Sequence, residues 1–144
     1  MLNSNGFKYT ATMTNALALE IPKNCWDTVL IPELGTLRKL FIHIVRLRDV
    51  YRDGLITGEV EFPGLLPSKD NRLVDELERS MNELASAFTQ SKFNQIKMGN
   101  QYLTIIELLN TAVQHEGIHQ GQYYVALKQA GIDLPKQWIQ DWNM

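Results

Sequence analysis

The chain has 144 residues, of which 44% are hydrophobic and 21% are charged. This length supports a sizeable core, so we expect one domain over residues 1–144. The net charge of −2 lacks the basic excess typical of nucleic-acid-binding proteins. No apolar run reaches the roughly 20 residues that cross a bilayer. We therefore expect neither a nucleic acid nor a membrane as a partner.

Cysteine usage and the N-terminal residues bear on the compartment. The single cysteine, Cys25, cannot form an internal disulfide, as is usual in a reducing environment. The first residues lack the basic and apolar regions of a signal peptide. We therefore expect a cytoplasmic protein.

Apolar residues recur at helical spacing in four segments. The predicted helices cover residues 7–19, residues 35–53, a segment that begins after Ser68 or Asp70 and carries a stripe from Leu73 to Phe88, and residues 103–130. Residues 89–102 are ambiguous, with a turn signal at Gly99-Asn100. Four striped helices without a convincing strand predict an all-α four-helix bundle.

Several residues are typical of helix ends. Thr36 is a candidate cap for the second helix, which Gly54 or Gly58 would end. Thr104 and Glu107 have the spacing of a capping box, and Gly131 follows the last helix at the place of a C-terminal cap.

Two of the three histidines lie four residues apart in the last predicted helix. Four residues advance a helix by just over one turn and about 6 Å, so His115 and His119 share one face. A lone buried histidine is commonly a core residue, but a pair side by side needs a partner for both rings. His43 lies on another helix, and bundles build metal sites from facing helices. We predict that His43, His115 and His119 bind one metal ion.

The string from His115 to His119 also matches the zincin motif HExxH, in which Glu116 would be the general base. That motif requires a third ligand downstream, and only the carboxylates of Asp133 and Asp141 follow. The chain is also short and offers no edge strand to align a peptide. These features disfavour a protease.

The segment His115-Glu116-Gly117-Ile118-His119-Gln120-Gly121-Gln122, followed by Gly131 and Pro135, resembles the last helix of the DinB-like (YfiT-like) metalloenzyme family. Upstream, Trp26 and the Gly35-Thr36-Leu37 run before His43 extend the similarity over nearly the whole chain. The resemblance implies a four-helix bundle, a divalent metal held by the three histidines, and a homodimer. Characterised members include transferases that use a low-molecular-weight thiol such as bacillithiol, and a mycothiol-dependent isomerase.

Three neutral histidines leave a divalent metal with an open position, as in catalytic sites. Such a metal can activate water for hydrolysis or bind a thiol as thiolate. The resemblance favours a thiol-dependent S-transferase acting on a small molecule. The alternatives are a metal-dependent hydrolase that uses Glu116 and a non-catalytic metal-binding bundle. The ligand set does not distinguish zinc, nickel, iron and manganese.

Two further polar residues are weaker candidates. Arg46 lies one turn after His43, where it could bind an anionic group of the substrate or remain a solvated surface residue. Gln122 lies three residues after His119, where it could orient that ring or simply pack.

Overall fold

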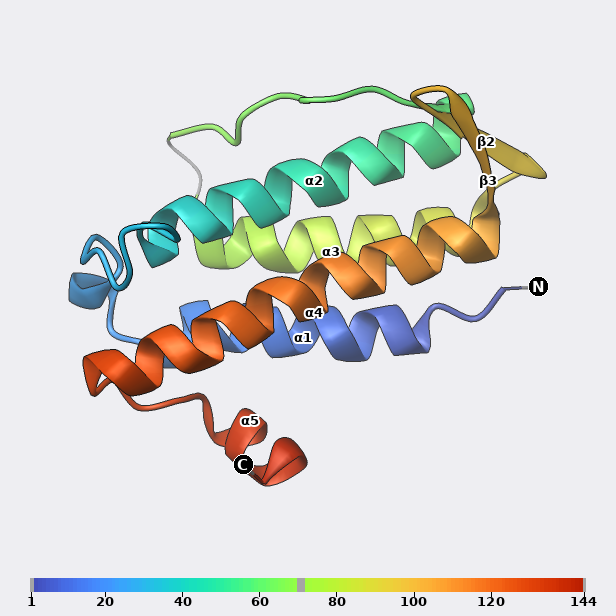
Figure 1. The fold of residues 1–144 in the computed structure, drawn as a ribbon. Helices are drawn as coiled ribbons and strands as arrows, with labels where there is room; N and C mark the ends of the chain where they lie inside the picture. The colour runs from blue at the N-terminus through green and yellow to red at the C-terminus, as the bar shows by residue number, and fades with distance from the viewer. Residues whose placement is uncertain (1, 70–71, 144) are drawn as a thin grey trace.

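The structure is a computed structural model that describes residues 2–69 and 72–143. Its four long helices are α1 (Asn5–Glu20), α2 (Leu37–Thr57), α3 (Leu73–Gln90) and α4 (Ile105–Ala130). The shorter elements are the 3-10 turn η1 (Lys23–Cys25), the strands β1 (Glu59–Val60), β2 (Gln95–Met98) and β3 (Gln101–Thr104), and the helix α5 (Lys136–Trp142). The predicted four-helix bundle is therefore confirmed (Figure 1).

The four long helices pack around a core made of two clusters of buried hydrophobic residues. Helices α1 and α2 each pack against both α3 and α4. In Figure 1, α2 and α3 run in the same direction, and residues 61–69 return along the outside of α2. The site described below uses the contact between α2 and α4. Within the described ranges, no helix combines the length and apolar character needed to cross a membrane.

A small sheet covers one end of the bundle, where we expected no strand (Figure 1). Strand β2 pairs in parallel with β1 and antiparallel with β3, with Ile96 opposite Leu103. These strands have two to four residues, which is too short for a clear alternation of buried and exposed side chains. Strand β3 leads directly into α4 and so fixes where that helix begins.

The helix ends follow the predicted caps in most places. The Thr36 hydroxyl accepts from the Lys39 amide, and Thr104 and Glu107 form the complete capping box. Gly131 adopts a left-handed conformation with φ of 71° after α4.

Two helix ends differ from expectation. Helix α2 continues past Asp53 and ends at Gly58, whose φ of 92° suits glycine. Helix α3 begins after Arg72, whose side chain makes no cap, so Ser68 is not its N-terminal cap. Asp70, the other candidate, lies outside the described residues.

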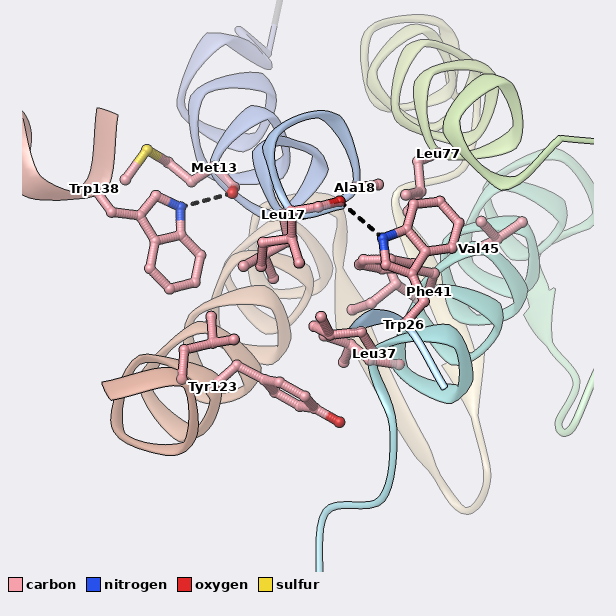
Figure 2. Packing of buried hydrophobic residues seen from close by; sticks show 14 residues of the cluster. Met13, Leu17, Ala18, Trp26, Leu37, Phe41, Val45, Leu77, Tyr123 and Trp138 are labelled. Atoms are coloured by element: carbon pink, nitrogen blue, oxygen red, sulfur yellow. Dashed lines mark hydrogen bonds between the residues drawn. The ribbon is translucent and has the colours of Figure 1, made fainter. Parts of the chain in front are cut away.

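The core next to the site is built around two tryptophans (Figure 2). The indole N–H of Trp138 donates to the Met13 carbonyl at 2.8 Å, which anchors α5 on α1. The indole N–H of Trp26 donates to the Ile21 carbonyl at 3.1 Å, which fixes the loop before α2. At the outer surface of α1, Tyr9 is 50% exposed and its hydroxyl donates to Asp141 in α5.

Candidate metal centre

The three histidines meet between α2 and α4. His43 Nε2 lies 2.9 Å from His115 Nε2, which lies 3.1 Å from His119 Nε2. One ligand nitrogen from each ring lies within 4.8 Å of the other two. Residues separated by more than 70 positions are thus brought to one point, because α2 packs on α4 and the spacing of four aligns the second pair.

This donor set fits a divalent metal ion. A neutral imidazole has one N–H donor and one acceptor nitrogen. His115 Nε2 faces two other Nε2 atoms, and a single proton there satisfies only one of these contacts. A cation between the rings uses all three lone pairs. Ligands about 2.0–2.1 Å from a tetrahedral metal lie about 3.3 Å apart, close to the two short distances observed.

Electrostatics keep two of these rings neutral. Burial, together with the smaller effects of the charges of His119, His43 and Arg48, lowers the pKa of His115 to about 3. Burial also lowers the pKa of His43, assisted by His119 and Arg46. Both rings therefore present unprotonated nitrogens at neutral pH, which is the form that binds metals.

Gln122 contacts the third ligand directly. Its side-chain Oε1 lies 3.0 Å from His119 Nδ1. When Nδ1 carries the proton and donates to Gln122, the Nε2 lone pair of His119 is free to face His43 and His115. Such partners of ligating histidines fix the tautomer and the ring orientation.

A cavity of about 260 Å³ opens beside the histidines. Its walls are Glu33, Leu34, Lys39, Leu40, His43, His119, Gln122 and Tyr123. The Tyr123 hydroxyl lies 3.3 Å from the Leu34 carbonyl and 3.2 Å from that of Thr36, which holds the loop before α2 against α4. Larger hollows lie elsewhere on the bundle, but this one is lined by two of the metal-ligand candidates.

Glu116 does not join the histidines. Its side chain is in the interior, only 2% of the residue is exposed, and its carboxylate pairs with Arg48 at 2.5 Å. Arg48 holds the Glu116 carboxylate in the interior, while the His115 ring faces His43 of α2. The spelling HExxH therefore does not produce the zincin arrangement here.

Arg46 anchors a loop. Its guanidinium donates to the Gly64 carbonyl through Nε at 3.1 Å and Nη2 at 2.9 Å. The residue is not part of the cavity wall beside the histidines. Its positive charge still acts on the site, because it helps to lower the pKa of His43.

Arg48 was not predicted to be buried beside the site. This residue is 2% exposed and contacts three other helices, although arginine is rarely buried. The available signal was its position, seven residues after Phe41 and four after Ile44, which places it on the apolar stripe of α2.

Comparison with known proteins places the chain in a family. Among curated proteins no match is found. The crystal structure of a DinB-like protein (YjoA) from Bacillus subtilis is similar, with a TM-score of 0.74, 20% identity, and coverage of 92% of this chain and 94% of that one. At this identity the likeness shows the fold alone. The family model described as the DinB family matches residues 3–138, and the chain therefore belongs to the DinB family.

Proposed function

We propose that this protein binds a divalent metal ion through His43, His115 and His119 and transfers a low-molecular-weight thiol, of the bacillithiol type, onto an electrophilic small molecule. The observation that carries the proposal is the convergence of three imidazole nitrogens beside a cavity. The resemblance to thiol-dependent DinB-like transferases supplies the choice of reaction.

Different residues would bind the metal, orient a ligand and bind the substrate. His43, His115 and His119 would hold the ion, which would supply the Lewis acidity that lowers the pKa of a thiol. Gln122 orients the His119 ring. The cavity admits the substrate, and the Lys39 side chain on its wall can pair with an anionic group. The thiol sulfur forms the new bond to carbon, a leaving group such as chloride departs with the electron pair, and the thiol proton passes to solvent.

The position of Glu116 weighs against a hydrolase. In that alternative a carboxylate must take a proton from water at the metal. The Glu116 carboxylate instead pairs with Arg48 in the interior. Thiol transfer makes no such demand on Glu116, since the metal would lower the pKa of a thiol enough for it to ionise without a strong base.

Metal analysis tests the first part of the proposal. We expect about one divalent ion per purified chain, and its loss in His43→Ala, His115→Ala and His119→Ala. Gln114→Ala is the matched control, because Gln114 is an exposed residue on the same helix as His115 and His119. Undiminished binding in all three histidine variants would refute the metal site.

Melting with and without chelator separates an enzyme from a non-catalytic bundle. We expect the metal-free protein to stay folded and to lose turnover. A large fall in melting temperature on adding chelator, in a protein whose metal has no open coordination position, would favour a structural metal instead.

We also propose that the protein forms a homodimer, as the resemblance implies. Support comes from one exposed face of α4, where Ile118 and Val125 flank Gly121. Light scattering should give twice the chain mass, and Ile118→Lys with Val125→Lys should give the monomer mass with unchanged helix content. A monomeric wild type at high concentration would contradict this.

A further inference from the structure

Arg48 joins all four long helices at the centre of the bundle. From α2, its Nη1 donates to Asn15 Oδ1 in α1 at 3.0 Å and to the Leu77 carbonyl in α3 at 2.8 Å. Its Nη2 donates to the Ala11 carbonyl at 3.3 Å and to Glu116 Oε1 in α4 at 2.5 Å. Among the described residues this is the ion pair in which both side chains are only 3% exposed.

This ion pair is built into the two helices that carry the metal ligands. Arg48 follows His43 by five residues in α2, and Glu116 immediately follows His115 in α4. Glu116 can reach the central guanidinium only if α4 has one rotation about its axis. The same rotation points His115 at His43, because neighbouring residues of a helix are about 100° apart.

A second contact fixes the same rotation one turn further along α4. Gln120 is 3% exposed, and its amide donates to the Thr10 carbonyl at 2.7 Å and to Thr14 Oγ1 at 2.8 Å, both in α1. Gln120 immediately follows His119, as Glu116 follows His115. Each of the two histidines in α4 is thus followed by a buried residue that hydrogen-bonds to another helix, Glu116 to α2 and Gln120 to α1.

Stability alone does not account for this ion pair. Replacing a buried pair by apolar residues of similar size is often neutral or stabilising, because two charges must be removed from water. In the described part of the chain, Arg48 Nε is also buried without a hydrogen-bond partner. A buried ion pair that is directional and costly to desolvate is better explained by a requirement to fix the orientation of α4.

We propose that Arg48 and Glu116 are positioning residues that hold α4 so that His115 and His119 face His43. In this role Glu116 orients the metal ligands through its interior contact with Arg48 and does not act as a base at the metal. The inference rests on the metal-binding part of the proposed function.

The test compares metal affinity with stability. Zinc affinity, measured by competition with a chromogenic chelator, is compared with the melting temperature in chelator for wild type, Arg48→Met/Glu116→Leu and Leu108→Ala. Leu108 is a fully buried residue of α4 that lies before the site and serves as the matched control. We expect the double variant to bind zinc about 10–100-fold more weakly, the range seen when partners of metal ligands are removed. The control should melt earlier but bind as wild type.

A second variant covers the case in which the double variant fails to fold. Glu116→Asp keeps the charge but is one methylene shorter, so α4 must shift to keep the ion pair, and we expect several-fold weaker zinc binding. Wild-type affinity in either folded variant would overturn the positioning role while leaving the metal site intact. A wild type that binds no zinc would instead overturn the proposed function and this inference together.

Discussion

Gln122 is the residue whose contact with a metal ligand is most easily removed without disturbing the core. It is exposed on α4, and its Oε1 lies 3.0 Å from His119 Nδ1. We expect Gln122→Ala to weaken zinc binding by about tenfold, because the His119 tautomer is no longer fixed. Gln114→Ala, at another exposed position of α4, should leave zinc affinity unchanged in the same competition assay. Equal affinities in the two variants would show that the contact does not orient the ring.

The lowered pKa values of His43 and His115 make the stability of the metal-free protein depend on pH. In the unfolded chain both rings titrate near a pKa of about 6.5, whereas burial lowers both values in the folded state, that of His115 to about 3. Between about pH 3 and pH 6.5 the unfolded state therefore carries a proton on His115 that the folded state lacks. The free energy of unfolding should be highest above about pH 7 and should fall as the pH drops toward 4, by at most about 1.4 kcal/mol per pH unit for the His115 proton.

Urea denaturation in chelator between pH 5 and 8 measures this dependence. His115→Ala removes the group with the stronger shift, so its free energy of unfolding should vary less with pH than that of the wild type. Identical slopes in the two proteins would contradict the shift assigned to His115.

Replacing a glycine by alanine should change the stability in opposite directions in α2 and in α4. A Cβ at Gly54 would lie 2.5 Å from Val60 Cγ2, because β1 packs tightly on α2. A Cβ at Gly121 would meet no atom within 4 Å. Gly54→Ala should therefore lower the free energy of unfolding by about 1–3 kcal/mol through overpacking. Gly121→Ala should raise it by up to about 1 kcal/mol, because alanine is the better helix former.

Chemical denaturation of the two variants at low protein concentration provides the comparison. Each variant is the control for the other, since both are glycine-to-alanine changes inside a long helix. A loss of stability in Gly121→Ala would contradict the expectation for an isolated chain and would indicate a second molecule packed on this face of α4.

For the whole molecule, the local features were predictable from sequence. The four helical segments and the caps at Thr36, Thr104 and Gly131 depend on residues close together in the chain, and these were confirmed. The spacing of four between His115 and His119 is likewise a local property. The contact of this pair with His43 followed only from the assumption that their two helices face each other.

What the sequence did not predict depends on distant partners. The HExxH match made Glu116 a candidate base in the hydrolase alternative, but its carboxylate pairs with Arg48, which lies 68 residues away in sequence. Arg46 could not be assigned to the Gly64 carbonyl without knowing that the connection after α2 runs back along that helix. The three short strands were not predicted, because their extended backbone depends on hydrogen bonds to one another and their composition gives no separate signal.

The reaction itself can be tested on the whole molecule with one comparison. We expect turnover of a chlorinated arene with a thiol such as bacillithiol, and its absence in His115→Ala. Glu116→Gln leaves Arg48 without its counter-charge, a change that costs about 3–5 kcal/mol in buried pairs, so rates must be expressed per folded, metal-loaded molecule. On that basis the thiol-transfer rate should stay within several-fold of wild type, because the glutamine oxygen can still accept from Arg48. A hydrolase that uses Glu116 as its base would instead turn over without thiol and lose about 10²-fold or more in the same variant. That result would refute the transferase activity. An absence of turnover with every thiol would refute the proposed reaction and leave only the proposed metal site.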